Sequence, residues 1–144
     1  MSDLLLAKPT PSVSIDDKAH WMLLIERNSY PTVEELGQPE ARIAGLRINP
    51  ANFSPSRQNY INNFILKDIR QNNQIQVKGL PIGLLAGQPT WNPAQTKIAF
   101  THSSANRVDL YVIDVATQTT KKIYRRPINT ILGAAFTWLN DQTL

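Results

Sequence analysis

The stretch PTWNPAQTKIAF, Pro89 to Phe100, sets a tryptophan before a tight Asn-Pro turn and an apolar strand after it. Proline presets the backbone at the second position of such a turn, and asparagine suits the first. A related stretch, WLNDQTL, begins at Trp138, 47 residues after Trp91, with a turn one residue shorter. The fold therefore depends on whether this strand-turn-strand pattern belongs to a repeat.

The repeat extends to the strands that follow the turn. FILKDIRQNNQIQV (Phe64–Val77) resembles LYVIDVATQTTKKI (Leu110–Ile123), since each has an apolar strand closed by aspartate, a short polar turn and a second strand. The two aspartates, Asp68 and Asp114, lie 46 residues apart. The same step relates three further pairs: Val77 and Ile123, Pro81 and Pro127, and Gly87 and Gly133. A less regular copy of the pattern lies earlier in the chain. In that copy Val13 aligns with Trp91, and Asp16 and Asp17 lie in the turn.

A period of about 40 to 50 residues with about four short strands is typical of a β-propeller blade. The sequence therefore predicts an all-β fold: an incomplete β-propeller of two four-stranded blades plus the first strand of a third. Blade 1 is expected at about 10–80, blade 2 at about 86–126 and the start of blade 3 at about 134–144, within one domain, 1–144. Two stacked sheets of a sandwich are the alternative, although a sandwich has no reason to repeat at a constant step.

The predicted blades differ in length because blade 1 carries a loop insertion. Blade 2 has four expected strands, at about 88–91, 97–102, 109–114 and 118–124. In blade 1 about 30 extra residues, about 27–59, lie between the second and third strands and should project from the blade. Within them, Thr32 and Glu35 have the spacing of a capping box that can start one helical turn.

Composition supports a folded domain and gives few functional signals. The 144 residues are 42% hydrophobic and 18% charged, and no cysteine is present, which excludes disulfides and thiolate nucleophiles. The net charge of +4 is spread along the chain, and the densest basic run, Lys121–Arg126, would divide its charges between the two faces of a strand. Protection of a sheet edge explains that run better than nucleic acid binding. No signal peptide or membrane-spanning run is visible, so the sequence leaves the compartment open.

The second unit, PTWNPAQTKIAFT followed by DLYVIDVATQTTKKI, resembles the TolB-like propeller repeats, seen also in the prolyl oligopeptidase family of serine peptidases. The insertion, PTVEELGQPEARIAGLRINP with Pro55-Ser56-Arg57 after it, looks like the amino-terminal region of the glutamyl-endopeptidase-like branch of that family. With PTPSVSIDDKAHWMLLIER before it, the resemblance covers nearly the whole chain. Ala94 and Gln95 depart from the usual Asp-Gly of the turn, which predicts a weaker turn because glycine most easily takes positive φ.

The resemblance implies a role for the chain. In that family the propeller precedes an α/β-hydrolase domain with the Ser, Asp and His, and it restricts and orients peptide substrates. This chain is similar to the early blades only, so it is expected to be a non-catalytic fragment. Its partners would be a peptide substrate or the absent α/β-hydrolase domain, and exposed blade faces should make it self-associate. A TolB-like protein-protein interaction scaffold without peptidase activity is the alternative.

Catalytic and metal-binding motifs are missing from the sequence. Acyl transfer on such a scaffold needs a Gly-x-Ser-x-Gly turn, and none occurs. The two histidines, His20 and His102, are far apart in sequence and have no short spacing to other metal ligands. We therefore expect no catalytic residue, no cofactor and no metal site.

The insertion supplies the candidate binding residues. Arg42 and Arg47 would present guanidinium groups on an exposed loop, where they suit carboxylates of a peptide or of a partner domain. Ordinary solvation, or ion pairs with Glu34, Glu35 or Glu40, is the alternative.

Overall fold

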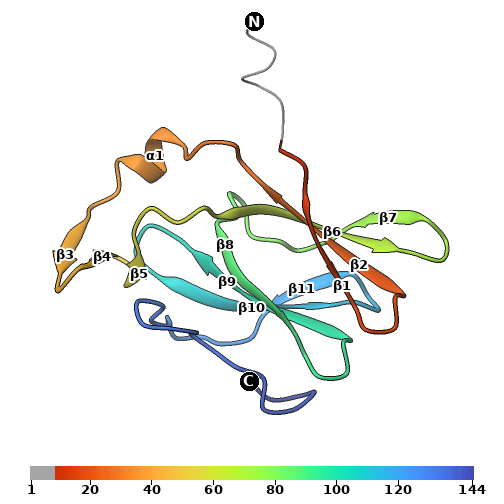
Figure 1. Ribbon diagram of the computed structural model, residues 1–144. Helices are drawn as coiled ribbons and strands as arrows, with labels where there is room; N and C mark the ends of the chain where they lie inside the picture. Colours follow the sequence, from red (N-terminus) through yellow and green to blue (C-terminus); the bar gives the residue numbers. More distant parts are fainter. Residues whose placement is uncertain (1–8) are drawn as a thin grey trace, which may run out of the picture.

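The computed structural model describes residues 9–144, which form two antiparallel units of four strands each, joined edge to edge, and a projecting arm (Figure 1). Unit 1 comprises β1 (Ser12–Ile15), β2 (Trp21–Arg27), β6 (Ile61–Asp68) and β7 (Asn73–Gln76), paired in that order. Unit 2 comprises β8 (Ala86–Trp91), β9 (Lys97–Ser103), β10 (Val108–Asp114) and β11 (Thr119–Lys122), also in chain order. Pairing of Ile61 with Ala86 makes the two units continuous as one eight-stranded sheet, and a parallel bridge between Lys78 and Thr119 links them a second time. The all-β class is confirmed, and within residues 9–144 the sheets form no closed ring.

The strand registers confirm the 46-residue step and correct one part of the repeat. Asp68 pairs with Trp21 in unit 1 as Asp114 pairs with Lys97 in unit 2, so the two aspartates occupy equivalent positions. At the first turn, Ile15 pairs with Met22 as Trp91 pairs with Ile98. Trp91 therefore corresponds to Ile15, and its predicted alignment with Val13 was wrong by two residues. Apolar residues alternate along both strands, so sequence pattern alone does not fix this register.

The turns between the first two strands of each unit have the same hydrogen bonds. Asp16 Oδ1 accepts from the backbone N–H groups of His20 and Trp21, and Asn92 Oδ1 accepts from those of Thr96 and Lys97. The fourth residue of each turn, Ala19 or Gln95, has a positive φ of 50° or 57°. Gln95 thus takes the conformation that glycine would adopt most easily, which fits the strain expected there.

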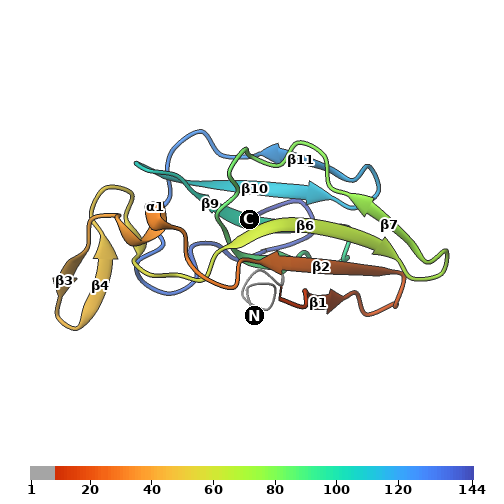
Figure 2. The same ribbon diagram turned by 90° about the horizontal axis from the view of Figure 1, so that it is seen from above.

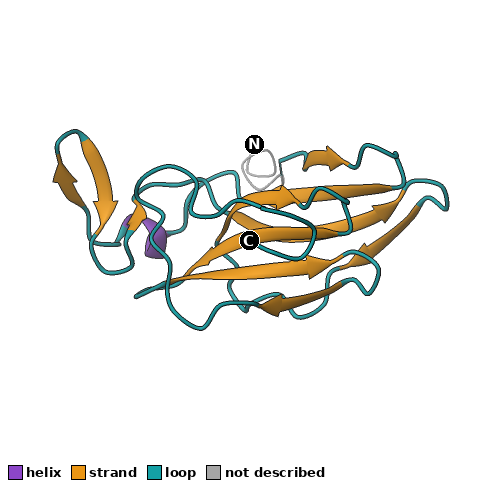
Figure 3. Ribbon diagram, turned by 90° about the horizontal axis from the view of Figure 1, so that it is seen from below, coloured by secondary structure: helices purple, strands orange, loops and turns teal. Residues whose placement is uncertain are grey.

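The predicted first strand of a third blade, at 134–144, does not form. A strand needs a neighbouring backbone for its hydrogen bonds, and this segment instead contacts unit 2 through hydrogen bonds in which one partner is a side chain. Ala135 N donates to Gln88 Oε1, and Ala94 N donates to Asp141 Oδ1. Residues 127–144 run irregularly along the face of unit 2 that points away from unit 1 (Figure 3).

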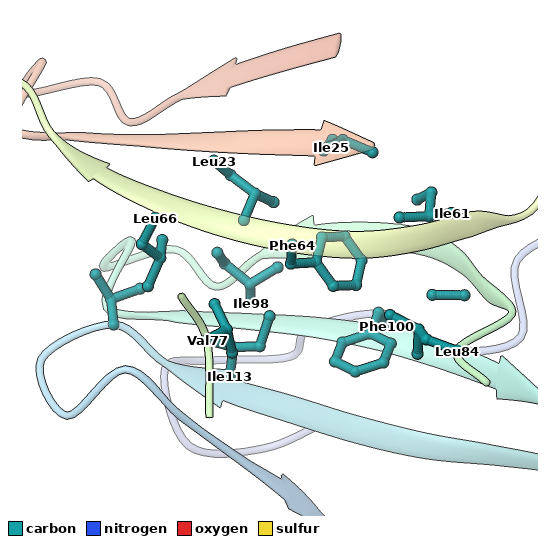
Figure 4. Close-up of a cluster of buried hydrophobic side chains, with 12 residues drawn as sticks. Leu23, Ile25, Ile61, Phe64, Leu66, Val77, Leu84, Ile98, Phe100 and Ile113 are labelled. Carbon is teal, nitrogen blue, oxygen red and sulfur yellow. The ribbon is translucent and has the colours of Figure 1, made fainter. Parts of the chain in front are cut away.

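The core lies between the two units, where unlike faces meet (Figure 4). Because side chains alternate along a strand, the register places each side chain on one face of its sheet. Unit 1 contributes the face of Leu23, Ile25, Phe64 and Leu66; unit 2 contributes the face of Ile98, Phe100 and Ile113. The unit 2 equivalent of Leu23 is Ala99, which lies on the opposite face from Ile98. The units therefore stack head to tail, with unlike faces in contact. A two-fold arrangement would instead bring equivalent faces together.

A tryptophan contact repeats from unit to unit in the same direction. Trp91 Nε1 donates to Ser14 Oγ at 2.9 Å, and Trp138 Nε1 donates to the carbonyl oxygen of Thr90 at 3.0 Å. Ser14 and Thr90 are equivalent by strand register. The segment around Trp138 thus contacts unit 2 as unit 2 contacts unit 1, although it has no strand.

The insertion forms the projecting arm, defined here as residues 28–60, between β2 and β6 as predicted (Figures 1 and 2). It contains α1 (Val33–Leu36) and a small sheet of β3 (Ala41–Ile43), β4 (Leu46–Asn49) and β5 (Ser54–Pro55). The capping box is confirmed, since Thr32 Oγ1 accepts from Glu35 N and Glu35 Oε2 accepts from Thr32 N. Buried Asn52 fixes the arm to unit 2 by donating from Nδ2 to the carbonyl oxygen of Ser104 at 2.8 Å.

Replacing Phe100 by alanine tests the interface between the units. Phe100 is fully buried, and its ring centroid lies 5.0 Å from that of Phe64 on the other unit. Phe100→Ala should lower the free energy of unfolding by about 3–5 kcal/mol, measured by urea denaturation. Ile82→Ala, at a fully exposed side chain, should leave it within about 0.5 kcal/mol. Equal stabilities for the two variants would contradict the packing described.

Candidate functional site

A cleft of about 690 Å³ lies where the arm leaves unit 1. Its walls come from residues 28–38 and 57–63, at the two ends of the arm, and from residues 80–85, which connect the units. Two tyrosines, Tyr30 and Tyr60, and six Asn or Gln side chains line it: Asn28, Gln38, Gln58, Asn59, Asn62 and Asn63. Amide and phenol groups both donate and accept hydrogen bonds, so this lining suits a ligand with many polar atoms, such as a peptide backbone.

A second hollow of about 170 Å³ adjoins the cleft and shares part of its lining. It extends towards β5 and includes Glu40 and Ser56, which the cleft does not. Arg57 and Tyr60 line both hollows. Pro31, Glu35, Gln38 and Gln58 line both hollows as well, so these six residues stand where the two spaces meet.

Glu40 gathers three arginines of the arm around one carboxylate. Its Oε1 lies 3.2 Å from Arg42 Nε and 3.4 Å from Arg47 Nη1, and its Oε2 lies 3.0 Å from Arg57 Nε. Ser56 Oγ donates to Oε2 at 2.8 Å. The hydrogen bond from Ser56, together with the guanidinium groups, holds the pKa of Glu40 below its ordinary value of 4.5. Three cations thus share one anion, which leaves a local charge excess of two.

The sequence-predicted residues Arg42 and Arg47 are therefore brought together, and each forms the ion pair with Glu40 that was the alternative to ligand binding. Neither lines the cleft or the second hollow. Arg57, which was not among the binding residues predicted from the sequence, lines both the cleft and the second hollow. In the sequence Arg57 stands in the Pro55-Ser56-Arg57 segment that carries the family resemblance, but no charge spacing pointed to a binding role. Contact of Arg42 and Arg47 with a peptide or a partner domain stays a prediction.

Arg57 is held in an unusual backbone conformation. Its φ is 58°, in the left-handed region that arginine rarely takes. Its Nε lies 3.0 Å from Glu40 Oε2 in an ion pair, and the side chain is 65% exposed.

An irregularity of the sheet lies beside the cleft, at Asn62. The pairing of β2 with β6 passes from Glu26 and Asn63 to Arg27 and Ile61, so Asn62 has no partner on β2. Bulges of this kind redirect side chains and often lie beside functional sites. The Asn62 side chain turns to Asn28, donating from Nδ2 to Oδ1 at 2.6 Å.

Neither histidine lines the cleft, although His102 is hydrogen-bonded to Leu85, which does. His20 occupies the β1–β2 turn, and His102 lies near the end of β9, opposite Asp109. His102 Nδ1 accepts from Leu85 N at 3.3 Å, and Asp109 is bound by Arg107 and Lys122 at 2.7 and 2.8 Å. Burial lowers the pKa of His102 below its ordinary 6.5, and nearby Asp109 opposes that shift only in part. Burial therefore favours the neutral form of the His102 imidazole.

The lowered pKa of His102 predicts a pH dependence of stability. The unfolded chain binds a proton at His102 below about pH 6.5, while the folded chain resists it. The free energy of unfolding should therefore fall as the pH drops below 6.5, towards the lower folded pKa. Comparing urea denaturation curves at several pH values should show a smaller decrease for His102→Asn, whose Oδ1 can replace the Nδ1 acceptor. An identical decrease in the variant would refute this assignment.

Metal and membrane features were also searched in the part of the chain that the structure describes. Residues 9–144 hold no group of three or more His, Asp or Glu side chains placed to bind a metal ion. The same residues include no helix with the length and apolar character needed to cross a membrane.

Comparison with known proteins relates the chain to peptidases at low identity. It is 22% identical to a probable chloroplastic glutamyl endopeptidase of Oryza sativa subsp. japonica over 157 aligned residues, covering 100% of the chain. It is 23% identical to the protein of the same description in Arabidopsis thaliana, over 99% of the chain. The chain spans 17% and 16% of the length of these relatives. No protein-family model matches it. These similarities support a peptidase-related family.

Proposed function

We propose that the chain is a TolB-like propeller segment of a serine peptidase that restricts and orients peptide substrates for an α/β-hydrolase domain. The head-to-tail contact of unlike faces is the observation that carries this proposal. Such a contact can be repeated from unit to unit, whereas a two-fold contact between like faces cannot. The repeated donation from Trp91 to Ser14 and from Trp138 to Thr90 supports it.

Sequence similarity to peptidases is independent support for the same proposal. The two plant relatives are described as glutamyl endopeptidases, and the similarity runs along the whole chain, arm included. The sequence has no Gly-x-Ser-x-Gly turn, so hydrolysis is assigned to another domain. The cleft between the arm and unit 1 then offers a surface that a peptide can contact on its way to that domain.

A TolB-like interaction scaffold is the second candidate, because the same stacked units can serve binding alone. The arm favours it through apolar side chains that lie on its surface: Val33, Leu36, Ile43 and Phe53 are each more than half exposed. The two candidates differ in what the gene encodes beyond Leu144. A reading frame that continues to a Gly-x-Ser-x-Gly turn supports the peptidase.

The restricting role predicts a change in substrate size selection. In the product of the complete reading frame, Phe100→Ala should loosen the contact between the units and admit larger substrates. We expect the rate of casein cleavage to rise severalfold relative to that of a short fluorogenic glutamyl peptide, with Ile82→Ala as the control. A complete product that cleaves no peptide, or an unchanged ratio, would reject the proposal in favour of the scaffold.

Self-association of this chain follows from the open face of unit 1. Val13, Ile15, Met22 and Leu24 share this face, which is equivalent to the face that unit 2 buries. Val13 and Ile15 are 51% and 50% exposed. Sedimentation velocity should therefore show a concentration-dependent dimer, in which this face meets a second copy, and Ile15→Lys should weaken it. A monomer at every concentration would contradict the expectation.

A further inference from the structure

We propose that the arm is a hinged lid on the cleft, held closed by the hydrogen bond from buried Asn52 to the carbonyl oxygen of Ser104. Release of this bond lets the arm swing away from unit 2 as one body and widens the cleft. The movement is a property of this chain by itself. Only its use, the admission of a peptide, rests on the proposed function.

The arm has none of the apolar burial that holds the two units together. Among residues 28–60, all of which the structure describes, the buried residues are Asn49, Asn52 and Ser54, and none of them is apolar. The small sheet of the arm is separate from the eight-stranded sheet of the units (Figure 2). A hydrogen bond adds little net stability compared with a buried apolar cluster. The arm can therefore detach while the units stay folded.

The latch consists of two neighbouring residues in one loop of the arm. Asn52 Nδ2 donates to the carbonyl oxygen of Ser104, in the turn between β9 and β10, at 2.8 Å. Its Oδ1 accepts from the backbone N–H and the hydroxyl of Ser54, at 3.1 and 2.7 Å, which fixes the orientation of the amide. The carbonyl oxygen of Phe53 accepts from the N–H of buried Thr130 at 3.1 Å. Opening of the arm must break the bonds to Ser104 and Thr130.

The wall of the cleft formed by residues 80–85 is fastened to the same end of β9. Ser103 N donates to the carbonyl oxygen of Leu85 at 2.9 Å, and Leu85 N donates to His102 Nδ1 at 3.3 Å. Leu85 itself lines the cleft. This wall keeps both bonds when the Asn52 bond breaks. Only the arm then moves, so the cleft widens.

The hinge lies where the arm joins unit 1. Residues 28–32 and 56–60 form neither strand nor helix. Beside them the register of β2 with β6 shifts, which leaves Asn62 without a partner on β2. Arg57 has a φ of 58°, which is rare for arginine. Hinges are loop or element-terminal residues that absorb changes of φ and ψ. The two segments can therefore rotate while β2 and β6 stay paired.

Amide hydrogen exchange, followed by NMR on the chain, tests the latch directly. The reporter amide is that of Thr130, because its bond to the arm breaks on opening. Asn52→Asp keeps the acceptor for Ser54 but replaces the Nδ2 donor by an oxygen, which the carbonyl of Ser104 repels. The reporter amide should then exchange at least about tenfold faster, since a buried carbonyl loses its partner.

Two controls distinguish a swinging arm from an unfolding one. The amide of Ser56 is bonded within the arm, so its exchange rate should not change in Asn52→Asp. Asn49 is as buried as Asn52, at 2% exposed, and its Nδ2 donates to Gln38 Oε1 inside the arm. Asn49→Asp is therefore the matched variant, and it should leave the reporter amide at its wild-type rate.

Thiol labelling shows whether release of the latch widens the cleft. The chain has no cysteine, so Gln58→Cys places a single thiol in the cleft, and Ile82→Cys places one at a fully exposed side chain. A bulky maleimide should react severalfold faster with Gln58→Cys when Asn52→Asp is added. The reaction at Ile82→Cys should keep its rate.

Asn52→Ala covers the case in which a buried carboxylate unfolds the chain, because it removes the donor without adding a charge. It should speed the reporter amide in the same direction. The inference is overturned by a reporter amide that keeps its wild-type rate in both variants, accelerates together with the amide of Ser56, or accelerates equally in Asn49→Asp. An unchanged labelling rate at Gln58→Cys also overturns it. Peptide hydrolysis by the complete gene product is a separate measurement, so the lid can fail while the proposed function stands.

Discussion

The contact between the inner face of unit 1 and the unlike face of unit 2 is the constraint on which the rest of the structure depends. Leu23, Leu66 and Phe64 on one side and Ile98, Ile113 and Phe100 on the other are fully buried, and the two phenylalanine rings are in contact. Neither unit can bury its apolar face alone, because a sheet needs a second layer to cover that face. The packed pair also supplies the rigid base from which the arm projects.

The arm depends on that base at both of its ends. Its strands are short and its helix has one turn, so its own burial contributes little to its stability. Anchoring through Asn52 and the β2–β6 pairing fixes where residues 28–32 and 57–60 face each other. The cleft and the Glu40 cluster thus exist because the core holds the two ends of the insertion in place.

The sequence was sufficient to predict the regular parts of this fold. Turn residues and the 46-residue step located the strands of unit 2 within two residues, and the position of the insertion and its capping box were confirmed. Prediction from the sequence failed where the local pattern of residues fits more than one structure. The register of β1 could slip by two residues without moving an apolar side chain to the other face, and a strand at 134–144 depends on a neighbouring strand that local sequence does not reveal. The convergence of Arg42, Arg47 and Arg57 on Glu40 is tertiary and carries no spacing signal, so Arg57 was missed.

The most direct test of the account is a set of nuclear Overhauser contacts measured on methyl-labelled protein. Head-to-tail stacking predicts contacts between the methyl groups of Leu23 or Leu66 and those of Ile98 or Ile113. It also predicts contacts from the indole N–H of Trp91 to Ser14. Contacts from Leu23 to Ala99, which would bring equivalent faces together, would contradict the stacking of the units.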